Sequence, residues 1–334
     1  MSTIPPPKLN INPPLVNSSN PWATSLEDLT VLYECPHTGA VTTRTSLLTG
    51  FAHNPSTHQF TLFDVATHKS QQDRTKLSGR ENASLNTLGY SPLALESYLG
   101  FVKTIAASHS ARPDKGFIVS VTGSPEDVAD CYRAISETAT LVPFSLAMEV
   151  NLSCPNIQGK PPPAYDGSAL LQYLNAIQGA LAHPYGPRIP CGLKTPPYTH
   201  STEYVELFKA LEASSSDSAP CPVSFITATN TLGSCLLLAD PEATTDSKPA
   251  LPDAGVGGMA GAPLHPLALG NVRTIRKMLD EKKETLGHIQ IIGVGGVLNS
   301  AGFKRMRGVG ADFVGVGTGL GIRGVDIFGE ILSK

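Results

Sequence analysis

The sequence predicts a (β/α)8 barrel, the TIM-barrel fold, as a single domain over residues 1–334 with long inserted loops at the carboxyl-terminal face. Eight short runs rich in β-branched and apolar residues recur along the chain, and helix-like segments follow most of them. A chain of 334 residues, 41% of them hydrophobic, is large enough to bury one barrel core. The eight runs are 39–45, 83–87, 117–123, 146–153, 191–195, 224–230, 289–296 and 312–318.

The segments between these runs include both helices and insertions. Residues 204–213 and 271–284 have apolar side chains at helical spacing. Residues 46–82 are too many for a plain connector, and we expect them to form a hairpin. Residues 239–266 are rich in proline, glycine and aspartate. Because barrels carry their active sites on loops that leave the carboxyl ends of the strands, we expect the site there.

Composition gives no sign of a nucleic-acid or membrane partner. The net charge is −3, and no apolar run reaches the roughly 20 residues that span a bilayer. The opening "MSTIPPPKLN" lacks the charged-then-apolar order of a secretory signal. We therefore expect a soluble, cytoplasmic protein.

Six cysteines are present, with no C-x-x-C pair and no histidine at zinc-ligand spacing, so we expect no metal site. In a reducing compartment most of them should be small buried residues. Cys154 differs from the others, because "MEVNLSCPN" (148–156) places it between Asn151 and Asn156 at the end of an apolar run.

Polar residues at the carboxyl ends of barrel strands share one mouth. A single amide at a strand end is usually a turn former. Four amides together with two basic residues instead favour a flat, amide-rich ligand that carries an anionic group. The residues predicted at this mouth are Arg44, Asn86, Asn151, Cys154, Asn156, Lys194, Asn230 and Thr231.

The last two runs end in the glycine motifs "GVGG" (293–296) and "GVGTG" (315–319). Either motif alone could be a tight turn, but on consecutive late strands the pair favours backbone binding of a phosphate. A dinucleotide fingerprint fits badly, because the G-x-G-x-x-G spacing is absent.

Lys194, in "CGLKTPP", is either a lysine that reaches solvent or one paired with an electron-rich ligand. Beside a phosphate site, the second reading suggests a phosphorylated cofactor whose ring gains negative charge, as reduced flavin does.

Six segments resemble class 1 dihydroorotate dehydrogenases, most closely the soluble class 1A type. The resemblance runs from about Pro13 to Ile331, and its specific part is "NLSCPN" followed by a strand-borne "LKTPPY". It implies an FMN-containing barrel, a homodimer, that oxidises dihydroorotate to orotate in pyrimidine (UMP) biosynthesis, with fumarate as electron acceptor. The segments are "EVNLSCPNIQGKPPPAYD", "GLKTPPYT", "ATNTLGS", "GVGGMAGAPLHPLALGNVR", "IIGVGGV" and "VGVGTGL".

By this resemblance Cys154 is the catalytic base, which takes the C5 proton of dihydroorotate while the C6 hydride goes to flavin N5. A free thiol has a pKa of about 8.5, so modest help would suffice at neutral pH. Class 2 enzymes use serine there, so the cysteine itself favours class 1.

The resemblance also implies the residues that bind the two ligands. Lys194 would lie beside flavin N1 and O2, the late glycines would hold the phosphate, and "GKPPPAYD" (159–166) would be a mobile lid. The substrate set is Arg44, Asn86, Leu88, Gly89, Tyr90, Asn151, Asn156, Asn230 and Thr231. The cofactor set is Ser19, Asn20, Arg44, Thr45, Asn86, Asn151, Lys194, Gly258, Gly295, Gly296, Gly317 and Thr318.

Three positions depart from the family pattern. Arg44 stands where the family has a lysine, Asn20 stands where a glycine is usual, and the chain ends before the family's C-terminal helix. Two alternatives therefore stay open: a flavin oxidoreductase of the same barrel family with a drifted substrate, and a non-catalytic paralogue that binds flavin or pyrimidine.

Overall fold

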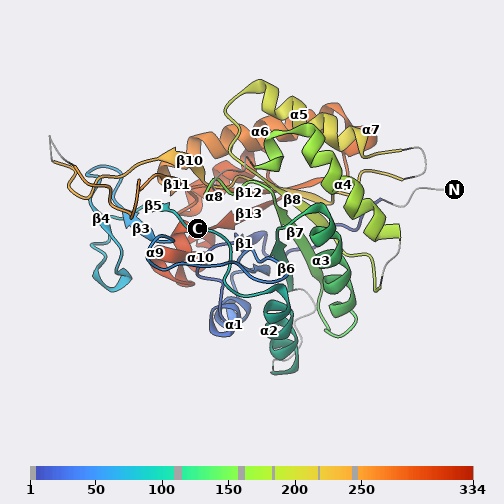
Figure 1. The fold of residues 1–334 in the computed structure, drawn as a ribbon, viewed down its shortest axis with the longest axis horizontal. Helices are drawn as coiled ribbons and strands as arrows, with labels where there is room; N and C mark the ends of the chain where they lie inside the picture. The colour runs from blue at the N-terminus through green and yellow to red at the C-terminus, as the bar shows by residue number, and fades with distance from the viewer. Residues whose placement is uncertain are drawn as a thin grey trace.

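The computed structural model describes residues 5–108, 115–156, 162–182, 185–216, 219–242 and 247–333. Its centre is a closed barrel of eight parallel strands, as the sequence predicts (Figure 1). Around the barrel the strands follow the order β1, β13, β12, β9, β8, β7, β6, β2. Their bounds are β1 Leu15–Asn17, β2 Ala40–Thr42, β6 Gly116–Val121, β7 Leu146–Asn151, β8 Cys191–Thr195, β9 Phe225–Ala228, β12 Gln290–Val294 and β13 Phe313–Val316.

Seven of the eight predicted runs contain barrel strands, but the run 83–87 does not. It forms β5 (Ala83–Asn86), which pairs antiparallel with two strands of a separate sheet. The eighth barrel strand is β1, which was not predicted from the sequence. Alternating apolar residues predict a strand but not the sheet it joins, and three residues after a pair of prolines are too few to show any alternation.

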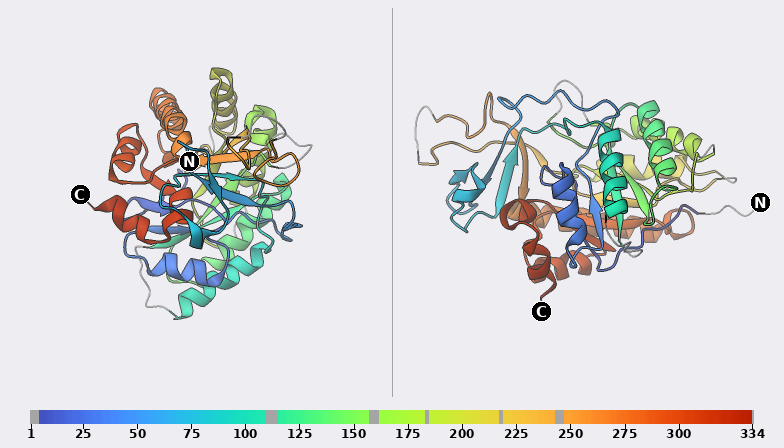
Figure 2. Two further views of the ribbon diagram at one scale, coloured as in Figure 1. Left: turned by 90° about the vertical axis from the view of Figure 1, so that its left-hand side faces the viewer. Right: turned by 90° about the horizontal axis from the view of Figure 1, so that it is seen from below.

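Helices surround the barrel (Figure 2), and both predicted helices are confirmed: 204–213 lies within α5, and 271–284 covers the end of α6 and the start of α7. No helix in the described ranges is long and apolar enough to cross a bilayer. The helices are α1 Leu26–Glu34, α2 Leu95–Ser108, α3 Pro125–Thr138, α4 Gly167–Ala182, α5 Ser201–Ala213, α6 His265–Glu281, α7 Lys283–Leu286, α8 Ser300–Gly308, α9 Thr318–Arg323 and α10 Asp326–Leu332.

Two apolar layers stabilise this arrangement. One fills the space between the strands and the helices, where outward-facing residues such as Met148 and Val150 are fully buried. The other fills the barrel interior towards the amino ends of its strands, with Ile118, Phe225 and Ile292 among its members. The interior is therefore filled mainly by apolar side chains towards the amino ends of the strands.

A second sheet of five antiparallel strands lies at one end of the barrel, on the left of Figure 1. It is built from two insertions, which follow the carboxyl ends of β2 and β9 along the chain. The predicted hairpin within 46–82 is confirmed as β3 paired with β4. The sheet order is β10 Leu232–Cys235, β11 Gly257–Gly261, β5, β3 Phe60–Phe63 and β4 Ser70–Gln71.

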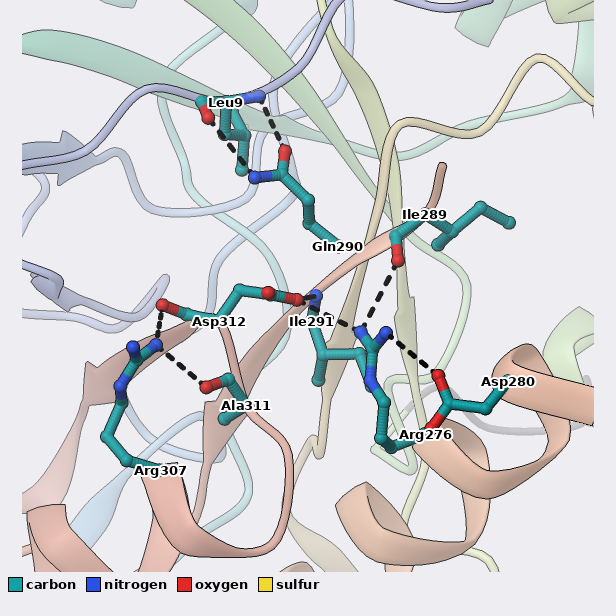
Figure 3. A network of polar contacts seen from close by, with 9 residues as sticks. All are labelled: Leu9, Arg276, Asp280, Ile289, Gln290, Ile291, Arg307, Ala311 and Asp312. Atoms are coloured by element: carbon teal, nitrogen blue, oxygen red, sulfur yellow. Dashed lines mark hydrogen bonds and ion pairs between the residues drawn. The ribbon is translucent and has the colours of Figure 1, made fainter. Parts of the chain in front are cut away.

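A polar network closes the amino ends of β12 and β13 (Figure 3). The Asp312 carboxylate accepts hydrogen bonds from the Ile291 backbone N–H at 2.7 Å and the Arg276 guanidinium at 3.0 Å. The Gln290 side chain bonds both backbone polar groups of Leu9, at 2.8 and 3.2 Å. The segment before β1 is thereby tied across this end of the barrel.

Candidate active site

A cavity lies between the carboxyl ends of the barrel strands and the five-stranded sheet. Gly258 is the one predicted site residue outside its lining, although its carbonyl accepts a hydrogen bond from the Asn86 side chain at 3.0 Å. The predicted residues that line the cavity are Ser19, Asn20, Arg44, Thr45, Asn86, Leu88, Gly89, Tyr90, Asn151, Cys154, Asn156, Lys194, Asn230, Thr231, Gly295, Gly296, Gly317 and Thr318.

Part of the cavity lining was not predicted from the sequence. Trp22 and Phe60 meet edge to face, with ring centroids 5.4 Å apart, and form an apolar wall. Trp22 could have been found, because it lies two residues after the predicted cofactor residue Asn20, whereas Phe60 has no local signal. The residues missed are Pro21, Trp22, Phe60, Ser84, Thr229, Ala260, Gly261, Leu264 and Val294.

Asn151, at the end of β7, organises one group of polar side chains in the cavity. Its amide donates to the Thr45 hydroxyl at 3.0 Å, and its carbonyl oxygen accepts from Asn230 at 3.1 Å and from the Ser153 hydroxyl at 3.1 Å. Asn230 also donates to the Ser153 hydroxyl at 3.0 Å. These bonds fix the amides in place before any ligand binds, which lowers the entropy cost of binding.

A second group joins the five-stranded sheet to the loop after β7. The Asn156 amide donates to the Asn86 side chain at 2.9 Å and to the Leu88 carbonyl at 2.8 Å. Asn86 therefore reaches the predicted cavity, although it arrives from β5 rather than from a barrel strand.

Arg44 spans the outer part of the cavity. Its guanidinium donates to the carbonyls of Tyr90 at 3.1 Å and Gly89 at 3.4 Å. The backbone N–H groups of those two residues have no hydrogen-bond acceptor among the described residues. Arg44 thus holds the carbonyl side of this turn and leaves its N–H groups available to a ligand.

Asn20 does not need a ligand to satisfy its side chain. Its amide donates to the Ser18 carbonyl at 2.6 Å, and its carbonyl oxygen accepts from the Trp22 N–H at 2.8 Å. These bonds accommodate the asparagine where the family pattern has glycine, and they brace the turn that carries Trp22.

Cys154 is half-buried in the cavity and has no disulfide partner. Burial raises the pKa of its thiol, while the Asn156 backbone and the charges of Lys194 and Arg44 act in the opposite direction. The thiol is therefore protonated at rest, and the two cations favour the thiolate that a base requires.

Lys194, at the end of β8, is 4% exposed and lines the same cavity. Its backbone belongs to the β8 ladder, but its ammonium makes no hydrogen bond or ion pair with any residue in the described ranges. A buried ammonium without a protein partner is costly, which fits a site whose ligand supplies the electron-rich atom.

The glycine turns after β12 and β13 present free donors. The backbone N–H groups of Gly296, Gly317 and Thr318 have no acceptor among the described residues. At Gly296 φ is +65°, and a Cβ would lie 2.5 Å from the Gly261 carbonyl oxygen, so only glycine fits. This cradle matches a phosphate, and with Lys194 it fits the two ends of FMN.

The predicted lid, 159–166, lies partly outside the described residues, at 159–161. Its remainder packs onto the barrel as a short 3-10 helix, Pro163–Tyr165. The Tyr198 hydroxyl donates to the Ala164 carbonyl at 2.8 Å.

Known dihydroorotate dehydrogenases are similar to this chain in sequence. The family model for dihydroorotate dehydrogenase matches residues 67–334. The chain is 28% identical over 321 residues to dihydroorotate dehydrogenase A (fumarate) of Lactococcus lactis subsp. cremoris, covering 96% of this chain and 88% of that protein. It is 30% identical over 255 residues to the probable dihydroorotate dehydrogenase A (fumarate) of Streptococcus pneumoniae, covering 75% and 71%.

A crystal structure of DHODH from Eimeria tenella, in complex with ferulenol, superposes with a TM-score of 0.68 and covers 95% of this chain and 79% of that one. At 16% identity this match supports the fold alone. The resemblance stated from the sequence is confirmed by the family match, and the chain belongs to the dihydroorotate dehydrogenase family, whose enzymes depend on FMN.

Proposed function

We propose that this chain oxidises dihydroorotate to orotate as a class 1A enzyme, with fumarate as its electron acceptor. One observation carries the proposal: the Cys154 thiol, the unpaired Lys194 ammonium and the free N–H groups of the glycine turns line one cavity. The names of the bacterial relatives support fumarate as the acceptor.

The cavity offers separate partners to the two ends of FMN. The N–H groups of Gly296, Gly317 and Thr318 would hold its phosphate, and Lys194 would neutralise negative charge on its ring. FMN, when bound, supplies the hydride acceptor.

The substrate would lie between the two asparagine groups. Asn151 and Asn230 form one side, and Asn86 and Asn156 form the other. The free N–H groups of Gly89 and Tyr90 would bind the substrate carboxylate. Cys154 would take the C5 proton, a proton on a carbon next to a carbonyl group.

The first test is an anaerobic absorption spectrum of the flavin-loaded protein before and after dihydroorotate is added. We expect the visible flavin band to bleach, and we expect fumarate to restore it in stoichiometric amount. A flavin band that stays unchanged in the wild-type protein would contradict the proposal. If a quinone or NAD⁺ restores the flavin band and fumarate does not, fumarate is not the electron acceptor, but oxidation of dihydroorotate still stands.

Arg44 motivates a second candidate, a barrel oxidoreductase that has drifted to another dihydropyrimidine. We expect dihydrouracil, which lacks the carboxylate, to reduce the flavin far more slowly than dihydroorotate does. We also expect Arg44→Lys to raise the KM for dihydroorotate several-fold, because one ammonium cannot hold two carbonyls as the planar guanidinium does. Faster turnover in this variant would favour the drifted substrate.

We infer further that the protein is a homodimer of the cytoplasm. Leu236 and Val256 are about half exposed and flank β10 and β11 in the five-stranded sheet, and β10 is an edge strand that another surface could cover. Free cysteines, four of them buried, suit a reducing compartment. Light scattering would test the dimer, and cell fractionation would test the location.

A further inference from the structure

His265 lies directly behind the Gly295–Gly296 turn. It is the first residue of α6 and is 8% exposed. Its Nδ1 lies 2.7 Å from the Gly295 carbonyl oxygen, and its Nε2 lies 3.1 Å from Nε of Arg305. Arg305 belongs to α8 and is exposed, so the imidazole links the outside of the barrel to the glycine turn.

These two contacts fix the protonation of the ring. A guanidinium nitrogen can only donate, so Nε2 of His265 must accept from Arg305. The single proton of the neutral ring is then on Nδ1, which donates to the Gly295 carbonyl. Burial lowers the pKa of His265 and Arg305 lowers it further, which keeps the ring neutral, although the Gly295 bond acts in the opposite direction.

The bonded carbonyl and a free N–H belong to the same peptide unit. The carbonyl of Gly295 and the N–H of Gly296 point in opposite directions across a trans peptide. A hydrogen bond to the carbonyl polarises the peptide and makes its N–H a better donor. The N–H of Gly296 has no acceptor among the described residues, and Gly296 lines the cavity.

The imidazole also limits how the turn can move. A Cβ built on Gly296 would lie 2.8 Å from the Cβ of His265, so the base of the histidine side chain packs tightly against the turn. A shift of the turn towards α6 is therefore blocked, and the hydrogen bond to Gly295 opposes a shift away from it.

We propose that His265 and Arg305 are positioning residues for the phosphate end of the cofactor: Arg305 holds His265 in one tautomer, and His265 orients and polarises the peptide whose N–H binds the phosphate. Neither residue is part of the cavity lining. The inference rests on the proposed function, which puts the FMN phosphate at this turn.

The test compares the affinities of FMN and riboflavin, which differ only in the phosphate, for protein stripped of its flavin. Quenching of flavin fluorescence measures both dissociation constants. We expect His265→Leu to weaken FMN binding about tenfold and Arg305→Leu somewhat less, in keeping with the loss of about one hydrogen bond. Riboflavin binding should not change. Lys304→Leu, an exposed lysine on the same helix, is the matched control.

A second variant separates positioning from general damage to the fold. The side-chain amide nitrogen of asparagine occupies nearly the position of Nδ1, so His265→Asn should keep the bond to Gly295 and recover most of the FMN affinity. Equal loss of FMN and riboflavin in His265→Leu, or no loss of either, would overturn the inference. Wild-type protein that binds FMN no tighter than riboflavin would overturn the phosphate assignment, and the inference with it.

Discussion

The two ends of the barrel use their polar groups in opposite ways. At the amino ends of β12 and β13, Asp312 and Gln290 are bonded to groups of the chain itself (Figure 3). At the carboxyl ends of the same strands, the N–H groups of Gly296 and Gly317 find no acceptor among the described residues. One end therefore stabilises the fold, and the other keeps its hydrogen-bonding capacity for ligands.

This difference has an energetic consequence. A buried lysine without a partner, such as Lys194, lowers the stability of the protein until a ligand pairs with it. A ligand that binds only the folded state raises stability in proportion to the logarithm of its concentration over Kd. FMN should therefore raise the melting temperature strongly, whereas variants at the closed end should act on the fold without affecting the ligand.

The largest effect is expected for Cys154→Ala. Removal of a general base costs about 10² to 10⁴ in rate, and the phosphate end of the site stays intact, so FMN should remain bound. The measurement is kcat together with the flavin content of the purified variant. Cys154→Ser, with a poorer base, should keep weak activity that rises only at high pH. Full activity in the alanine variant would remove Cys154 from the mechanism.

The pH dependence of flavin reduction is the next largest effect. Only the thiolate accepts a proton, so the rate should rise as pH rises through the pKa of Cys154, which burial places above the ordinary thiol value. Lys194 lowers that pKa, so Lys194→Met should move the rise to still higher pH. Stopped-flow reduction of flavin-loaded protein measures this, with Lys304→Met as control. An unmoved profile would show that Lys194 does not assist the thiol.

How much of the fold and of the site could be predicted from the sequence depends on how far apart along the chain the contacting residues lie. Asn151 and Lys194 end barrel strands, and all carboxyl ends of a parallel barrel meet at one face, so their positions along the chain gave their places in space. Asn86 was predicted in the correct cavity for a wrong reason. It was assigned to a barrel strand, because local alternation of apolar residues could not distinguish β5 from a barrel strand.

Contacts between distant elements left no local signal. The meeting of Trp22 with Phe60 depends on how the hairpin folds over the β1 loop. The contact of His265 with Arg305 joins α6 to α8, 40 residues apart along the chain. Neither pair could be predicted from spacing or periodicity, because the packing of whole elements brings them together.

At the closed end, Asp312→Ala should lower the free energy of unfolding by about 1–2 kcal/mol. It removes a partly exposed ion pair with Arg276 and a charge-assisted bond from the Ile291 N–H. Chemical denaturation measures the change, and Asp280→Ala, which removes a mostly exposed contact with the same arginine, should change stability by under about 0.5 kcal/mol. The Kd of FMN should not change. A weaker Kd would show that the two ends are coupled.

Apart from the Asp280→Ala control, the smallest effect is expected for Gln290→Leu, at about 1 kcal/mol. Leucine has a similar size but cannot bond the backbone of Leu9, so one N–H and one C=O near the barrel floor lose their partners. Water can reach this partly buried site and recovers some of the loss, which is why the effect is smaller than that of Asp312→Ala. Hydrogen exchange at the Leu9 amide should speed up in the variant, while amides in β8 keep their protection. An unchanged exchange rate at Leu9 would mean that the side chain of Gln290 does not hold the segment before β1.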